Sequence, residues 1–93
     1  MKLYWKEKNK VMADVGFEFW MKNPFQLIYS EGENKITIPG EMLTGETELL
    51  VSMSTIKKWD PPYSSVVDGE KQKQIIENVR LALDFMKIRY EEN

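Results

Sequence analysis

Carboxylates are the side chains of this chain that could do chemistry, and they occur in close pairs. Glu46 and Glu48 are two residues apart in a stretch with the composition of a strand, so both would lie on one face of a sheet. Such a pair could bind a basic partner or hold a hard metal ion. Its more common role is a charged sheet edge that faces solvent. The other close pairs are Glu31 with Glu33, Asp68 with Glu70, and Glu91 with Glu92.

The residue types that most enzymes rely on are missing. The chain has no histidine and no cysteine, which excludes a thiol nucleophile, a Ser-His or Cys-His pair, and imidazole or thiolate metal ligands. No acidic loop of the calcium-binding type occurs, so we expect no metal site. A carboxylate-based enzyme would need an acid of raised pKa in a deep cleft. We expect instead a binding protein without catalytic residues or cofactors.

Size and charge further restrict the functions that this protein could have. The 93 residues fit a single domain, residues 1–93, and 42% hydrophobic with 30% charged residues is a globular balance. Fifteen acidic against thirteen basic residues give a net charge of −2, which argues against nucleic-acid binding. No stretch of about 18 apolar residues occurs, and charges close to Met1 interrupt any signal peptide. We therefore expect a cytoplasmic protein with no membrane partner.

The segment 59–63, Trp-Asp-Pro-Pro-Tyr, is unusual because two aromatic residues flank a stiff, extended stretch. On the surface it would be a preorganised contact area for a partner. In the interior, Trp59 would close one end of a sheet while the prolines direct the chain into the next helix. We favour the interior for Trp59 and leave both roles open for Tyr63.

One long helix is predicted over residues 68–86. Asp68 is suited to cap its first turn, where Glu70 would interact favourably with the helix dipole. The alternation in residues 87–91 predicts a short final strand after the helix. Apolar residues recur in the helix with a period near 3.6 and define one buried face: Ile75, Ile76, Val79, Leu83 and Met86.

A hairpin is the clearest prediction before the helix. Residues 25–30 and 35–38 have strand composition, and the turn between them contains Gly32 and Asn34, which tolerate positive φ. Pro39-Gly40 is expected to end the hairpin.

The remaining segments complete an α+β architecture. Residues 54–59 predict one helical turn capped by Ser54, and residues 11–15 suit either a strand or a helix. The simplest arrangement is an antiparallel sheet of about four to six strands packed against the long C-terminal helix, with a final short strand. Further strands are expected at 2–6, 16–20 and 46–53.

Several short motifs follow one another in a characteristic order from Tyr29 onward. They are Tyr29-Ser30-Glu31-Gly32, then Ile36-Thr37-Ile38 followed by Glu41, the Ser-x-Ile-x-x-Trp-x-x-Pro stretch from Ser54 to Pro62, and Ile75-Ile76-Glu77-Asn78-Val79 in the helix. This order resembles the immunity protein 74 family of bacterial polymorphic-toxin and contact-dependent inhibition systems. The resemblance covers roughly the last two thirds of the chain, and residues 1–24 do not match it.

The resemblance implies a cytoplasmic protein that binds and neutralises one cognate toxin domain, and it carries over no catalytic residues. Nuclease toxins are usually basic because they hold phosphates, so an acidic inhibitor would gain association rate and specificity against them. The alternative is a small homo-oligomeric α+β protein-interaction module, such as a homodimer formed at an open sheet edge. The residues that we expect to contact the toxin are Glu31, Glu33, Glu46, Glu48, Tyr63 and Asp68.

Overall fold

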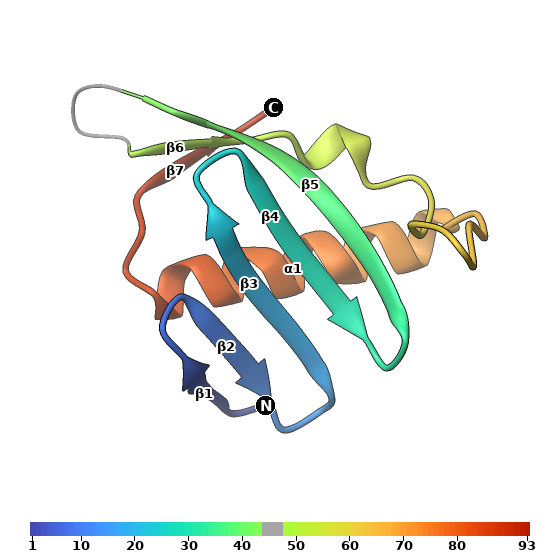
Figure 1. Cartoon of the computed structure of the whole chain (residues 1–93), viewed down its shortest axis with the longest axis horizontal. Helices are drawn as coiled ribbons and strands as arrows, with labels where there is room; N and C mark the ends of the chain where they lie inside the picture. The colour runs from blue at the N-terminus through green and yellow to red at the C-terminus, as the bar shows by residue number, and fades with distance from the viewer. Residues whose placement is uncertain (44–47) are drawn as a thin grey trace.

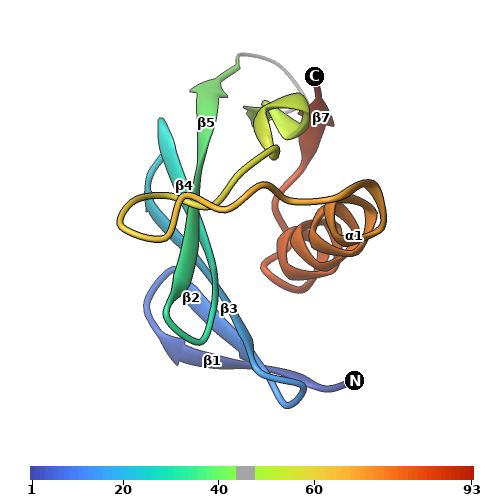
Figure 2. The same ribbon diagram turned by 90° about the vertical axis from the view of Figure 1, so that its right-hand side faces the viewer.

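A curled sheet wrapped around a single long helix forms the fold of this chain (Figures 1 and 2). The computed structural model describes residues 1–43 and 48–93. In these residues, seven strands lie side by side in the same order as in the sequence. The helix packs against one face of the sheet and leaves the opposite face uncovered (Figure 2). This confirms the predicted α+β class with one long helix and a final short strand.

Most strands precede the helix, and one follows it. None of the helices in the described part of the chain is long and apolar enough to cross a membrane. The elements are β1 (Leu3–Glu7), β2 (Lys10–Ala13), β3 (Phe17–Asn23), β4 (Gln26–Glu31), β5 (Asn34–Met42), β6 (Leu49–Val51), the 3-10 helix η1 (Met53–Thr55), α1 (Gly69–Phe85) and β7 (Tyr90–Glu92).

The last strand pair differs from the rest of the sheet. Neighbouring strands from β1 to β6 pair antiparallel, whereas β6 and β7 run parallel. Because α1 lies between β6 and β7 in the sequence, the chain travels back along the helix and re-enters the sheet in its earlier direction. The sheet therefore has seven strands instead of the four to six expected, and it is antiparallel only as far as β6.

β2 resolves the ambiguity at residues 11–15 in favour of a strand. Val11 lies opposite Phe19 of β3, and Phe19 lies opposite Tyr29 of β4. Residues that lie opposite each other point to the same side of a sheet. These three fully buried side chains form one row on the face toward α1, and a helix at this position would remove the first member of the row.

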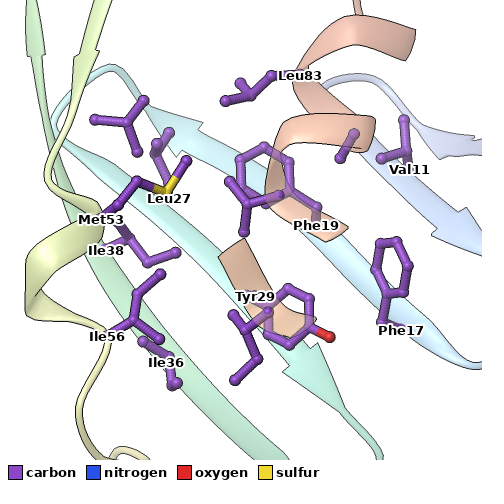
Figure 3. Packing of buried hydrophobic residues seen from close by; sticks show 14 of the residues in the cluster. Val11, Phe17, Phe19, Leu27, Tyr29, Ile36, Ile38, Met53, Ile56 and Leu83 are labelled. Carbon is purple, nitrogen blue, oxygen red and sulfur yellow. The ribbon is translucent and has the colours of Figure 1, made fainter. Parts of the chain in front are cut away.

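The core lies between that sheet face and α1 (Figure 3). The ring of Phe17 stacks on that of Tyr29 with the centroids 5.5 Å apart. Trp59 joins the core with 7% of its surface exposed, as we favoured from the sequence. The apolar period of the helix is confirmed by the residues that α1 buries, which are Ile75, Val79, Ala82 and Leu83.

Pro39-Gly40 does not end the hairpin, contrary to the expectation from the sequence. β5 continues because it changes its partner strand here: Pro39 lies opposite Gln26 of β4, and Gly40 already pairs with β6. Proline cannot donate a ladder hydrogen bond. Its carbonyl oxygen nevertheless accepts one from the N–H of Ser52 at 3.0 Å, so the chain stays extended across the change of partner.

Gly40 contacts the turn between β3 and β4. Its N–H donates to the carbonyl oxygen of Phe25 at 3.1 Å, and a Cβ atom at this position would lie 2.5 Å from the carbonyl oxygen of Pro24. Gly40→Ala is therefore expected to displace the turn and to lower the free energy of unfolding by about 1–3 kcal/mol in urea denaturation. Gly69→Ala is the control, because a Cβ there would meet nothing within 4 Å. Equal unfolding free energies for the two variants would contradict this expectation.

The helix begins as predicted, whereas the short turn before it does not. Asp68 caps α1, since its Oδ1 accepts a hydrogen bond from the N–H of Lys71 at 2.8 Å. The turn expected after Ser54 is η1, and its N-cap is Ser52 without a side-chain hydrogen bond. The hydroxyl of Thr55, the last residue of η1, instead donates to the carbonyl oxygen of Ser52 at 2.7 Å and stabilises the turn.

Candidate functional site

Acidic side chains from three segments meet at one end of the molecule; two of the segments follow each other directly, and the third lies 30 to 40 residues earlier in the sequence. The segments are the β4–β5 turn, the loop between η1 and α1, and the first turn of α1, which lie on the same side in Figure 1. Hydrogen bonds connect the segments to one another. We call this surface the acidic end and define it by Glu31, Glu33, Asp60, Tyr63, Asp68 and Glu70.

Glu31 is held in a fixed orientation at the acidic end. Its Oε1 accepts a hydrogen bond from the ammonium of Lys71 at 2.5 Å, and its Oε2 accepts one from the hydroxyl of Tyr29. The amide of Asn78 donates to the same hydroxyl oxygen at 3.0 Å. Burial, and after it the hydrogen bond to Glu31, raises the pKa of Tyr29, so its hydroxyl keeps its proton and remains a donor.

Lys71 links the β4–β5 hairpin to the start of the helix. Its backbone N–H donates to Asp68, and its ammonium forms the ion pair with Glu31. The ammonium also donates to the side-chain oxygen of Gln74 at 3.1 Å. One lysine thus sets the positions of two of the carboxylates that we expect to contact a partner.

Tyr63 connects the loop before α1 to the β4–β5 turn. Its hydroxyl donates to Oε2 of Glu33 at 2.7 Å, and this hydrogen bond raises the pKa of Tyr63. The neighbouring Asp60 accepts a hydrogen bond from the hydroxyl of Thr37 at 2.7 Å and donates its N–H to the carbonyl oxygen of Lys35 at 2.7 Å. These contacts hold the loop against β5 while Tyr63 stays 49% exposed.

Of the other two predicted contact residues, Glu48 does not join the acidic end. Glu48 begins the second described range, and its N–H donates to the carbonyl oxygen of Arg89 at 2.9 Å. It lines a mostly apolar hollow of about 330 Å³ together with Met21 and Met42. Glu46 lies outside the described residues. The predicted residues that the structure brings together are Glu31, Glu33, Tyr63 and Asp68.

Tyr29→Phe tests the network that orients Glu31. The variant removes a hydroxyl that donates to Glu31 and accepts from Asn78, and it leaves the ring in the core. We expect the free energy of unfolding to fall by about 1–2 kcal/mol in urea denaturation. Tyr4→Phe is the matched control, because Tyr4 is 44% exposed. A loss no larger than that of the control would contradict a role for the buried hydroxyl.

The acidic end is better suited to recognition than to catalysis. A hollow of about 230 Å³ lies beside Glu31 and Lys71, but both carboxylate oxygens of Glu31 already accept hydrogen bonds. Protonation of Glu31 would remove the negative charge that pairs with Lys71, so the network opposes a role for Glu31 as a general base. Across residues 1–43 and 48–93, no three acidic side chains are arranged to hold a metal ion. Oriented carboxylates of this kind recognise positively charged groups of a partner.

The comparison with protein families decides the class of this chain. A family model described as Immunity protein 74 matches residues 26–91. The chain belongs to the immunity protein 74 family. The match spans more than two thirds of the chain and confirms the resemblance seen in the sequence motifs. No curated protein and no solved structure matches the chain.

The boundaries of the match divide the fold of this immunity protein 74 family member into two parts. The matched part begins with β4 and contains the whole acidic end together with η1 and α1. β1, β2 and β3 precede the match. The surface that gathers the carboxylates therefore lies within the matched residues, and three further strands extend the sheet on the N-terminal side.

Some residues that form or support the acidic end have no local sequence signal that connects them with the others. Lys71 follows Asp68 by three residues, but the residue that its ammonium reaches, Glu31, is 40 residues away. Asp60 lies in the Trp-Asp-Pro-Pro-Tyr segment, where the aromatic residues rather than the carboxylate are the conspicuous feature. The position of Glu70 is already explained by its favourable interaction with the helix dipole, so the sequence indicates no further role for it. The contacts of the loop with β5 and of Lys71 with Glu31 reveal that these side chains share a surface.

Proposed function

We propose that this chain is the immunity protein of a nuclease-type toxin, that it binds and neutralises the toxin domain in the cytoplasm, and that it does so without catalysing a reaction. Membership of the immunity protein 74 family supports the class of partner. The observation that carries the proposal is the acidic end, where oriented carboxylates from three segments form one surface.

Charge explains why the acidic end suits a nuclease. An enzyme that cleaves nucleic acid holds phosphates with lysine and arginine side chains, and a surface of carboxylates is complementary to those side chains. Complementary charge accelerates association and excludes neutral or acidic partners. The carboxylates of Glu31 and Asp68 are already held by hydrogen bonds, so they lose little side-chain entropy on binding.

The contacts are expected to centre on Glu33 and Tyr63. Glu33 is exposed, and Tyr63 is 49% exposed, whereas Glu31 and Asp68 have structural partners of their own. A tyrosine that is fixed by a hydrogen bond offers a large, rigid contact area, which is typical of residues that dominate interfaces. We therefore propose that the carboxylates steer the toxin and that the ring of Tyr63 anchors it.

Co-expression with the toxin domain encoded by the neighbouring reading frame tests this proposal. We expect a complex that survives size-exclusion chromatography, growth of cells that the toxin otherwise kills, and suppression of nucleic-acid cleavage by the purified toxin. Cells that die despite co-expression, with no complex in the lysate, would reject the proposal. A complex with a toxin that cleaves no nucleic acid would retain the immunity function and reject the nuclease type.

The alternative, a homodimer joined at an open sheet edge, would use β1 or β7, the two outer strands of the described sheet. β7 is only three residues long and carries Glu91 and Glu92, and a short, charged edge strand disfavours strand addition. The pairing register of β1 shifts between Trp5 and Glu7, and the residue between them is Lys6. An irregular register and an edge lysine both disfavour the addition of another strand. Sedimentation velocity of the purified chain is therefore expected to give the mass of one chain, and a stable dimer would favour the alternative.

A further inference from the structure

The outer face of the sheet, opposite α1, contains a further hollow. α1 lies on the other side of the sheet (Figure 2). The hollow has a volume of about 310 Å³ and is formed by strands β1 to β5. We call it the basic hollow, because lysines are the most numerous of its lining residues: Lys6, Lys10, Lys35, Glu18, Trp20, Ile28, Ser30 and Gly32.

An apolar floor underlies the basic hollow. Lys10 lies opposite Trp20, and Trp20 lies opposite Ile28, so the three side chains form one row on the outer face. Trp20 and Ile28 are only half-buried there. The ammonium of Lys10 lies above the indole ring of Trp20, 4.7 Å from the ring centroid. The hollow thus combines cationic groups with an exposed apolar surface, which is a common composition for a protein contact area.

The lysines of the basic hollow exceed the carboxylates that could neutralise them. Lys6 forms an ion pair with Glu18 at 2.9 Å, and Lys10 forms one with Glu7 at 3.3 Å. Lys35 is exposed and makes no ion pair within the described ranges 1–43 and 48–93. The two paired lysines are themselves accessible, with 45% and 23% of their side chains exposed.

Charge is distributed unequally along the chain. Residues 1–25 contain five lysines and three acidic residues, whereas residues 26–93 contain eight basic and twelve acidic residues. The boundary coincides with the start of the family match at residue 26. The strands that extend the sheet beyond the family match therefore add positive charge to an otherwise acidic protein, and two of the three lysines of the hollow come from them.

We propose that the basic hollow binds an acidic peptide segment of the toxin, with carboxylates between the three lysines and an apolar side chain on Trp20 and Ile28. The inference rests on the proposed function, because the segment belongs to the same toxin that the acidic end binds. It adds a second contact surface of opposite charge, contributed largely by strands outside the family match. Such a surface would select one toxin among several that present a similar basic site.

A single-stranded nucleic acid is the competing occupant, since lysines beside an aromatic ring are also typical of nucleic-acid grooves. Such grooves stack bases on an open aromatic face. At Trp20 the ammonium of Lys10 already lies above the ring, and Glu18 adds a negative charge to the hollow. Both features favour an acidic peptide, whose carboxylates are separate, over a single-stranded nucleic acid with its continuous phosphates and stacked bases.

A peptide titration of the protein alone tests the basic hollow. The probe is a blocked hexaglutamate peptide with one central leucine, and the signals are the indole N–H resonances of Trp5, Trp20 and Trp59 in an NMR spectrum at low salt. We expect the Trp20 signal to shift during the titration while the other two stay in place. Lys35→Glu, at an exposed position, is expected to lower the affinity for the peptide by about tenfold. The double variant Lys10→Glu with Lys35→Glu is expected to abolish peptide binding.

Controls separate this site from general charge effects. Lys57→Glu with Lys58→Glu changes the net charge by the same amount at two exposed positions away from the hollow, and we expect it to leave peptide binding nearly unchanged. An equal loss in this control, or no shift at Trp20, would overturn the inference. So would hexauridylate binding more tightly than the peptide, which would make the hollow a nucleic-acid site.

The titration also separates the inference from the proposed function. It requires no toxin, so binding of the peptide without formation of a toxin complex would reject the proposed function alone. Conversely, a toxin complex that forms as tightly with Lys10→Glu and Lys35→Glu as with the unaltered chain would reject the second contact surface and leave the acidic end as the binding site.

Discussion

Glu33→Lys combined with Glu70→Lys is expected to weaken toxin binding by about 100-fold or more at low salt. Both side chains are exposed at the acidic end, and their replacement would oppose the proposed basic surface of the toxin with like charge. The loss of steering should lower the association rate, and the loss of contacts should raise the dissociation rate. Surface plasmon resonance with immobilised toxin domain measures both rates, and survival of cells that co-express the toxin gives the functional effect.

The matched control for this variant is Glu41→Lys with Glu91→Lys. Both residues are exposed and lie outside the acidic end, and the change in net charge is the same. We expect the control to retain binding within a few-fold and to protect cells. An equal loss of affinity in both double variants would mean that net charge, rather than the arrangement of carboxylates at the acidic end, attracts the toxin.

Phe19→Ala is expected to have the largest effect on stability, with a loss of about 3–5 kcal/mol in the free energy of unfolding. Phe19 is fully buried between Val11 and Tyr29 on the sheet face toward α1. Removing its ring leaves a cavity in the middle of the small core that a domain of 93 residues can form. Such a loss is a large part of the total stability of an ordinary domain.

Phe25→Ala serves as the control, because it also removes a phenyl ring, but from a position that is 60% exposed. We expect it to change the free energy of unfolding by less than about 1 kcal/mol. Urea denaturation followed by tryptophan fluorescence measures both variants. Similar midpoints for the two would show that the sheet face around Phe19 is not the packed core.

The elements whose residues interact within a few positions could be predicted closely. The cap at Asp68 and the apolar period of α1 define a helix that begins at Gly69 and ends at Phe85, within one residue of the predicted bounds. The hairpin of β4 and β5 also follows from local composition and a tight turn. Trp59 is buried, which agrees with the interior position favoured from the sequence, because burying a large aromatic side chain is favourable.

Several features depended on partners that local patterns do not specify. β5 continues through Pro39 because β6 replaces β4 as its neighbour. η1 is capped by Ser52 rather than Ser54, since the hydroxyl of Thr55 bonds to the carbonyl oxygen of Ser52. Lys71 holds Glu31 in place at the acidic end, which the spacing of carboxylates does not suggest, and Glu48 lies outside this surface.

The amino-acid sequence alone determined the helix, the hairpin, the α+β class and the family, because each depends on periodicity, capping or motifs within short stretches of chain. Only the tertiary structure decided that β7 pairs parallel to β6 and that Glu31 meets Lys71 across 40 residues and Glu33 meets Tyr63 across 30. Contacts at such separations form when the whole sheet closes around α1. Packing must compensate for the entropy lost in closing the intervening chain, and the spacing of residues along the sequence does not encode that packing.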